Sequence, residues 1–341
     1  MLSVICYTDS IPIYGGAIKM KTQECAAKLK HEIAKIFVGK SEQIELIIMS
    51  IFTGGHVLLD DLPGSGKTTL IKTISRALGC DFKRIQFTPD LLPSDIIGMT
   101  IFDRNSSTFK QVKGPIFTNI LLADEINRAI PRTQAALLEA MEEQQVTIDH
   151  DTFALPEPFF VMATENPVER ESTFRLPAAQ MDRFFVRLSL GFPNREEEAR
   201  MLNELGDVID FSVVDVVSSP EKLMEIRREI QGVYVSDHIK EYIVDLVHRS
   251  REHKLLKSGA SPRASRCLFQ GGKSYAAIQG RDYVTPEDIA AIFLPIMAHR
   301  VTISNEARYT QKSEADILVS ILEETPVPPG KARMFDEAAG K

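Results

Sequence analysis

The apolar residues of this sequence follow helical spacing in some stretches and form short continuous runs in others. Between residues 24 and 37 they recur every three or four positions, which predicts an amphipathic helix, and a second apolar helix is expected over 41–53. The run HVLLD at 56–60 has the length of a buried strand. After a glycine-rich loop, a helix is expected from about residue 67 to 78, and Gly79 should end it.

More strand-length apolar runs alternate with helical segments in the first half of the chain. Strands are expected at residues 82–87, 119–125, 159–166 and 184–190. One of the helices between them is expected at 131–143. Strands that alternate with helices favour a parallel sheet covered on both faces. The sequence therefore predicts an α/β fold for this half.

The pattern changes after Pro193, because strand signals stop there and helical spacing continues. Helices are expected at 195–206, 220–231, 236–256, 262–279, 286–299 and 311–324. We therefore expect an α/β core over residues 20–194 and an all-helical second domain over 195–325. Residues 1–19 are expected to be a poorly ordered extension or a mis-assigned start, and the Pro- and charge-rich tail 326–341 should fray.

Composition and charge narrow the class of protein. The 341 residues include 44% hydrophobic and 26% charged positions, which is typical of a soluble globular protein. The net charge of -7 makes nucleic acid an unlikely main partner, since gripping a phosphodiester backbone usually needs a basic surplus. Four widely spaced cysteines, without a signal peptide or an apolar run long enough to span a membrane, favour reduced thiols and a cytoplasmic location.

The stretch LLDDLPGSGKTTL ends like a phosphate-binding loop, but Asp61 stands where the first glycine of such a loop is expected. Gly64 and Gly66, which would lie nearest the phosphates, are present, and Asp61 at the mouth of the loop is tolerable if its φ stays negative. Lys67 would reach the β- and γ-phosphates, and the Thr68 hydroxyl would bind Mg²⁺. The expected nucleotide-binding residues here are Asp61, Leu62, Pro63, Gly64, Ser65, Gly66, Lys67, Thr68 and Thr69.

A second motif, ILLADEIN, places two acids at the end of an apolar strand. Doubly wound sheets bind ligands at the carboxyl ends of their strands. Asp124 is therefore expected to hold Mg²⁺ through water, and Glu125 to polarise the attacking water as a general base. The alternative for an isolated motif of this kind is a strand that ends in solvated acids.

Several long segments together resemble the MoxR family of AAA+ ATPases. They are GHVLLDDLPGSGKTTL, RIQFTPDLLPSDIIG, GPIFTNILLADEINRA, TQAALLEAMEEQQVTID, FFVMATENPVE and LPAAQMDRFFVRL. The resemblance runs from about residue 31 to 195 and continues through GASPRAS at 259–265 and VTPEDI at 284–289. It implies an AAA+ core with a C-terminal helical lid. Asp is common in that family at the position of Asp61, so the resemblance implies that the loop binds ATP.

The resemblance also implies roles for residues outside the loop. Asn166 matches sensor 1, which orients the attacking water or contacts the γ-phosphate. Arg183 matches the arginine finger, which acts on the nucleotide of a ring neighbour, and Arg263 matches sensor 2, which reaches the nucleotide of its own subunit. Val38 and Gly39 resemble the segment that borders adenine.

We add one expectation about the second predicted strand, which ends near Gln86. This amide is expected to hold Glu125 inactive until a partner binds.

Two hairpins are expected within the core. Residues 97–114 read as one hairpin with Asn105-Ser106 at its turn, and residues 145–156 as another with His150-Asp151 at its turn. The resemblance implies that such hairpins face the pore of a ring or a partner, although polar-tipped hairpins are often plain loops.

As a whole, the resemblance implies a chaperone-like ATPase that hydrolyses Mg·ATP between the subunits of a ring, most simply a hexamer. Its role would be to remodel or activate a partner, often a protein with a von Willebrand factor A domain, or to assist metal-cofactor insertion. Two alternatives stay open. One is a nucleic-acid-dependent AAA+ motor, and the other is an ATP-binding switch with little turnover.

Overall fold

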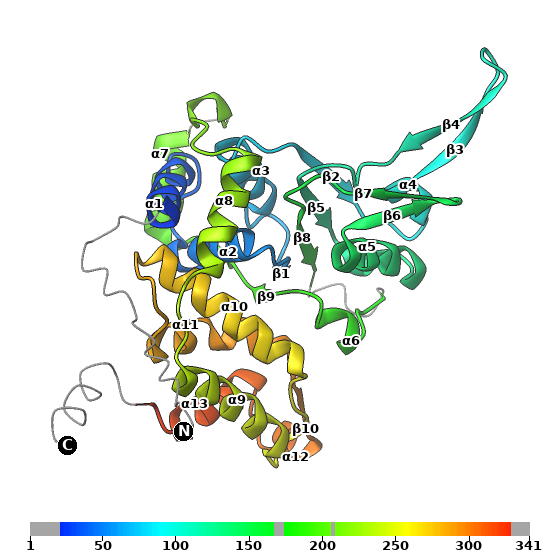
Figure 1. The fold of residues 1–341 in the computed structure, drawn as a ribbon. Coiled ribbons are helices and arrows are strands. Elements are labelled where there is room, and N and C mark those ends of the chain that lie inside the picture. Colours follow the sequence, from blue (N-terminus) through cyan, green and yellow to red (C-terminus); the bar gives the residue numbers. More distant parts are fainter. Residues whose placement is uncertain (1–20, 167–173, 206–208, 329–341) are drawn as a thin grey trace, which may run out of the picture.

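The computed structural model describes residues 21–166, 174–205 and 209–328. The expected extension at 1–19 and most of the expected tail, from 329 onward, lie outside the described residues. The described chain forms a sheet-containing half followed by a helical half (Figure 1). Within these ranges, none of the helices combines the length and the apolar composition needed to cross a bilayer.

Five parallel strands form the central sheet, in the spatial order β2-β5-β8-β1-β9. Their bounds are β1 Val57–Asp60, β2 Phe82–Gln86, β5 Ile120–Asp124, β8 Phe160–Glu165 and β9 Val186–Leu188. Each of the five predicted strands is therefore present. Since all five run in the same direction, their carboxyl ends share one edge of the sheet and their amino ends share the opposite edge.

Successive residues of the central strands pack on opposite faces of the sheet. Leu121 of β5 belongs to one hydrophobic cluster and Leu122 to the other. The face of Leu122 packs against α1 Lys21–Ala34, α2 Ser41–Thr53 and α3 Lys67–Ala77. The face of Leu121 packs against α4 Pro93–Ile97 and α5 Pro131–Glu143. A strand buried on both faces needs apolar residues at every position, which is why β1, β5 and β8 read as continuous apolar runs.

The region after Pro193 is mostly helical, as predicted. Its helices are α7 Arg195–Leu205, α8 Pro220–Gln231, α9 Asp237–Glu252, α10 Pro262–Ile278, α11 Pro286–Met297, α12 Asn305–Tyr309 and α13 Glu314–Glu324. Side chains of α8, α9, α10 and α11 belong to the same hydrophobic cluster as α1–α3. The lid region thus packs against one face of the sheet half, and the boundary at residue 194 stays a prediction.

The prediction that strands stop at Pro193 is wrong in one detail. Strand β10 Leu256–Ser258 pairs antiparallel with β11 Thr302–Ile303. Helix α9 ends at Glu252 because His253 has an extended backbone, so the predicted helix 236–256 is too long. Strands of three and two residues are too short to show an alternating pattern in the sequence.

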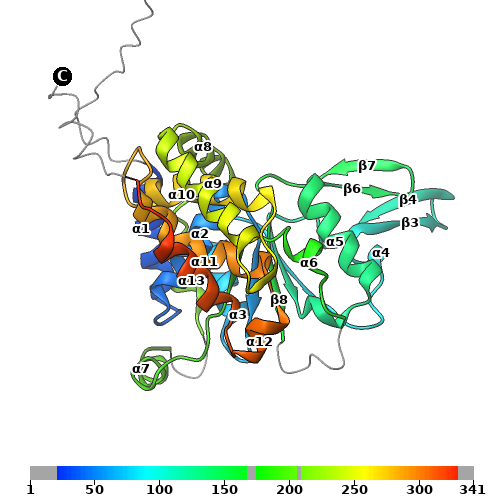
Figure 2. The ribbon, with the colours of Figure 1, turned by 90° about the horizontal axis from the view of Figure 1, so that it is seen from below.

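Both predicted hairpins are present and project together from the sheet (Figures 1 and 2). The first pairs β3 Gly98–Asp103 with β4 Thr108–Lys113, with its turn at 104–107. The second pairs β6 Gln145–Ile148 with β7 Asp151–Ala154. Its turn is at Asp149-His150, one residue earlier than predicted, because Asp149 takes the left-handed conformation at φ 55°.

The two hairpins are joined to each other by a side-chain hydrogen bond. The Gln111 amide of the first donates to the Asp151 carboxylate of the second at 2.6 Å. The short elements α6 Ala178–Met181, η1 Ile126–Arg128, η2 Phe211–Val213 and η3 Ala298–Arg300 complete the fold.

Candidate functional site

The predicted phosphate loop, residues 61–67, connects the end of β1 to the start of α3. Gly64 and Gly66 have φ values of 86° and 81°, which only glycine adopts at low cost. A Cβ on Gly66 would lie 2.9 Å from the ring of Phe37. Lys67, the first residue of α3, donates from its ammonium to the main-chain oxygen of Asp61 at 3.0 Å. The turn therefore has the backbone shape that a phosphate loop requires.

The Asp61 side chain bonds to residues more than a hundred positions away in the sequence. Its carboxylate accepts hydrogen bonds from the Ser189 hydroxyl at 2.7 Å and from the N–H groups of Leu190 and Gly191 at 2.8 and 2.9 Å. Asp61 is 3% exposed, and it is not among the non-glycine residues with positive φ in the described ranges. The residue that replaces the first glycine of the loop therefore fastens the loop to the segment after β9.

The first acid of the ADE motif is held by two partners on neighbouring strands. Asp124 ends β5, and one of its carboxylate oxygens accepts from the Thr164 hydroxyl at 2.7 Å. The other oxygen pairs with the guanidinium of Arg84, on β2, at 2.6 Å. Sequence reasoning missed Arg84, because an arginine in an edge strand reads as an ordinary solvated position.

The second acid is held in an uncommon backbone conformation. Glu125 has φ 57° and donates its N–H to the Thr164 hydroxyl at 2.8 Å. Its carboxylate accepts from the Gln86 amide at 2.7 Å and pairs with Arg128 at 3.1 Å. The contact expected between Gln86 and Glu125 is therefore present.

Asn166 lies at the end of β8 and is 3% exposed. It lines a cavity of about 190 Å³ together with Asp60 and Arg187, which form an ion pair. The rest of the matched motif, residues 167–169, lies outside the described residues. The loop, Asp124, Glu125 and Asn166 thus lie along the same carboxyl edge of the sheet.

The residues at this edge fit a nucleotide and its magnesium ion. The Ser65 hydroxyl in the loop is buried and has no hydrogen-bond partner within the described chain, so a phosphate oxygen would satisfy it. Thr68 is the second residue of α3, whose N-terminal dipole favours an anion. Oxygen ligands such as the Thr68 hydroxyl and the Asp124 carboxylate suit Mg²⁺.

The predicted adenine border lies between the two halves of the chain. Val38 is 7% exposed, and Gly39 has φ 77° with the Glu197 carboxylate of α7 packed against its Cα. Lys40 donates to the main-chain oxygen of Phe192 at 2.9 Å. A border of this kind would contact a base through main-chain atoms, which a residue pattern does not reveal, and the role of Val38 and Gly39 stays a prediction.

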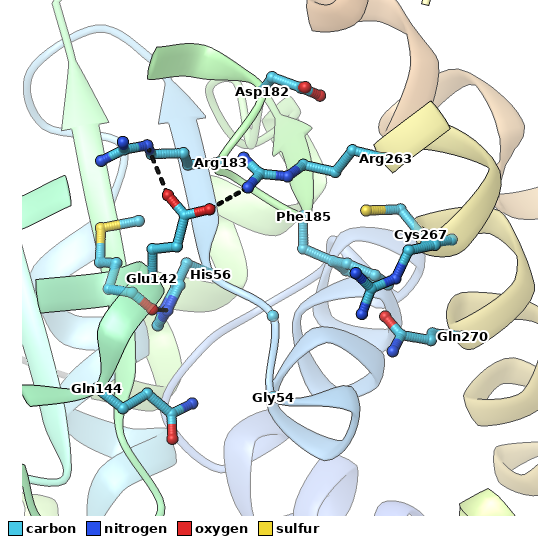
Figure 3. Close-up of a pocket in the computed structure, with 13 residues that line it drawn as sticks. Gly54, His56, Glu142, Gln144, Asp182, Arg183, Phe185, Arg263, Cys267 and Gln270 are labelled. Atoms are coloured by element: carbon cyan, nitrogen blue, oxygen red, sulfur yellow. Dashed lines mark hydrogen bonds and ion pairs between the residues drawn. The ribbon is translucent and has the colours of Figure 1, made fainter. Parts of the chain in front are cut away.

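Arg183 and Arg263 meet at the opposite edge of the sheet (Figure 3). Both pair with Glu142, near the end of α5: Arg183 Nε lies 3.1 Å from its Oε2, and Arg263 contacts its Oε1. They line a cavity of about 330 Å³ with Gly54 and His56, which precede β1. We call Arg183, Arg263 and Glu142 the arginine cluster.

The position of the cluster bears on the role that the resemblance implies for Arg263. The phosphate loop follows β1, whereas Gly54 and His56 precede it, and a strand of four residues spans about 13 Å. In this subunit Arg263 therefore lies at the edge away from the phosphate loop, and which nucleotide it reaches stays a prediction. Helix α10 begins beside Asp182, to which its N-cap Ser261 donates at 2.8 Å, so it presents Arg263 to the amino edge of the sheet.

The charge of this cavity comes from arginines and carboxylates. Burial lowers the pKa of His56 to about 4, so its ring is neutral near pH 7. Its Nδ1 accepts from the Val161 N–H at 3.0 Å, and its Nε2–H donates to the Met141 carbonyl at 3.1 Å. Burial raises the pKa of the Cys267 thiol, which argues against thiolate chemistry there.

Comparison with known proteins supports an ATPase. The model of the family described as "ATPase family associated with various cellular activities (AAA)" matches residues 56–186, and that of the AAA lid domain matches residues 248–321. The chain is 43% identical to the uncharacterized protein YeaC of Bacillus subtilis, over 88% of this chain and 94% of that protein.

Two further similarities extend over most of the chain. Chaperone MoxR1 of Mycobacterium tuberculosis is 37% identical over 87% of this chain and 81% of its own length. The crystal structure of a protein from Cytophaga hutchinsonii that was proposed to be an ATPase superposes with a TM-score of 0.85, at 38% identity, over 90% of this chain and 96% of that chain. With its AAA core, its lid and these relatives, the chain belongs to the MoxR family of AAA+ ATPases.

Proposed function

We propose that this protein hydrolyses ATP at the interfaces between subunits of a ring, most simply a hexamer. One observation carries the proposal: the phosphate loop and its acids lie at the carboxyl edge of the sheet, and the arginine cluster lies at the amino edge. A single subunit therefore holds two half-sites that face away from each other. Two subunits placed edge to edge would bring the phosphate loop of one beside the arginine cluster of the other.

At the carboxyl edge, the loop would bind the nucleotide. Its N–H groups and Lys67 would bind the phosphates, and Thr68 and Asp124 would hold Mg²⁺, which when bound neutralises phosphate charge. Glu125 would polarise the attacking water, and Asn166 would orient it. These roles agree with the burial and position of each residue in the described chain.

The bonds of Glu125 support a restrained resting state. Its Oε2 accepts from Gln86 at 2.7 Å and pairs with Arg128 at 3.1 Å, so a water molecule competes with two donors for that oxygen. We infer that Gln86 releases Glu125 when a partner binds, which would couple hydrolysis to the arrival of a client.

At the amino edge, Arg183 would act as the finger on a neighbour's nucleotide. Because Arg263 lies beside it, we assign Arg263 to the same neighbour. Positive charge delivered at the transferring phosphate stabilises the transition state, and fingers of this kind contribute about 10³–10⁵ in rate. Hydrolysis should then depend on assembly.

The client is proposed to be another protein in the cytoplasm. The relative named Chaperone MoxR1 supports a chaperone-like role, and the paired hairpins offer a projecting surface. We propose a von Willebrand factor A domain protein, or a protein that receives a metal cofactor, as the client. The net charge of -7 disfavours a nucleic-acid motor, and ATPase rates that do not change when DNA is added would agree with this choice.

The assembly proposal is tested by mixing two inactive variants. Lys67→Ala keeps its finger but lacks the loop lysine, and Arg183→Ala keeps its loop but lacks the finger. Where an Arg183→Ala subunit borrows the finger of a Lys67→Ala neighbour, the interface is complete, so a mixture should recover part of the ATPase rate. If subunits exchange and no activity returns at any ratio, or if Arg183→Ala alone is fully active, the proposal fails.

A further inference from the structure

Glu142 stands between two arginines that come from distant parts of the sequence (Figure 3). Each oxygen of its single carboxylate takes one guanidinium, Oε2 that of Arg183 and Oε1 that of Arg263. All three side chains are partly exposed, with 37% of Glu142, 31% of Arg183 and 38% of Arg263 accessible. The three charged tips therefore lie where an approaching molecule can contact them.

The backbone beneath the two arginines is fixed by a separate set of bonds. The Asp182 carboxylate accepts from the Ser261 hydroxyl and from Arg300 Nε, both at 2.8 Å. The Arg300 side chain is 1% exposed, and Ser261 caps the helix by accepting from the Arg263 N–H at 3.2 Å. Asp182 precedes Arg183 directly. The bases of both arginines are thus anchored, whereas their tips rest on a half-exposed carboxylate.

The charge around Glu142 is suited to an anion. The lining of the cavity carries three arginines, Arg183, Arg263 and Arg266, against two carboxylates, Glu142 and Asp182, which leaves one positive charge. Guanidinium groups bind carboxylate and phosphate oxygens through the same donors. A phosphate that reaches the cluster must therefore compete with Glu142 for those donors, and it is also repelled by the Glu142 charge.

We propose that Glu142 is the resting counter-ion of the two arginines and that the γ-phosphate held by the neighbouring subunit displaces it. This inference rests on the proposed function, in which Arg183 and Arg263 act on a neighbour. Glu142 is then a brake on nucleotide engagement, since each ion pair must break before the arginines reach the phosphate. Partly exposed pairs change an equilibrium by about 1.4- to 5-fold each, so the two together amount to about 2- to 25-fold.

The test compares Glu142→Gln with the matched control Glu143→Gln. Both remove one acid from the last turn of α5, but Glu143 forms neither pair with the arginines. In a steady-state ATPase titration, Glu142→Gln should lower the half-saturating ATP concentration by about 2- to 25-fold, with kcat within twofold of wild type. Glu143→Gln should behave like wild type. If the Glu142→Gln protein does not fold, Glu142→Ala repeats the test, because alanine is compatible with the end of a helix.

The outcomes separate this inference from the proposed function. If Glu142→Gln and Glu143→Gln have equal half-saturating concentrations while the mixed Lys67→Ala and Arg183→Ala proteins regain activity, the brake is refuted and the shared site stands. A fall in kcat for Glu142→Gln would mean that the acid positions the arginines productively, which also overturns the brake. In an Arg183→Ala/Arg263→Ala background, which lacks the turnover needed for this titration, Glu142→Gln should leave the affinity for a fluorescent ATP analogue unchanged. A fully active Arg183→Ala protein would overturn both proposals.

Discussion

Replacing Asp61 by glycine would restore the usual phosphate-loop pattern, and we predict that it destabilises the protein. The Asp61 carboxylate accepts three hydrogen bonds, from Ser189, Leu190 and Gly191. Leu190 is 2% exposed, so its N–H would lose its partner in a place that water does not easily reach. An unsatisfied buried group costs about 1–3 kcal/mol.

The other two donors, on Ser189 and Gly191, belong to exposed residues and can bond to water instead. The loss of these two hydrogen bonds therefore adds less to the destabilisation, about 0.5–1.5 kcal/mol together. We therefore expect Asp61→Gly to lower the free energy of unfolding by about 2–4 kcal/mol. The measurement is urea unfolding followed by far-ultraviolet circular dichroism, because the chain contains no Trp.

Two further variants isolate the cause. Asp61→Ala should lower the free energy of unfolding nearly as much as Asp61→Gly does, because the loss of the carboxylate causes the destabilisation and the added backbone freedom of glycine does not. Asp61→Asn keeps one oxygen acceptor and should lose about half. An Asp61→Gly protein as stable as wild type, or more stable, would refute the assignment of Asp61 as an anchor.

Three other changes have definite expected outcomes. Lys67→Ala should abolish tight binding of a fluorescent ATP analogue, and unchanged affinity would contradict the phosphate-loop assignment. Glu125→Gln should bind the analogue normally and hydrolyse ATP about 10²–10⁴-fold more slowly, whereas wild-type turnover would point to another base. Burial lowers the pKa of His56 to about 4 in the folded chain, below about 6.5 in the unfolded chain. The neutral ring therefore contributes fully to the free energy of unfolding above pH 6.5, and this contribution falls on acidification, by about 2 kcal/mol at pH 5. His56→Gln should be less stable than wild type overall. Measured by urea unfolding, its free energy of unfolding should fall between pH 7.5 and pH 5 by about 2 kcal/mol less than that of wild type. An equal fall in the two proteins would contradict this role of His56.

The sequence alone determined the elements and the chemistry that depend on short stretches of chain. Helices α2 and α5 occupy the predicted ranges, because helical spacing repeats within a few turns. The phosphate loop could be predicted because both of its glycines, Lys67 and the flanking strand and helix are adjacent in the sequence. The acids Asp124 and Glu125 likewise end an apolar strand that is visible as a run.

The tertiary structure alone decided which distant groups meet. Asp61 finds its partners about 130 positions later, and Arg84 reaches Asp124 across the sheet. The edge on which Arg263 lies depends on how α10 packs beside the amino end of β1, and no local pattern encodes that choice. Glu142 was an ordinary helix-end acid in the sequence, and it gains its place between two arginines only because three separate elements converge there. Local propensity fixes elements, whereas burial of their shared apolar faces fixes their arrangement, and the arrangement sets where each charge lies.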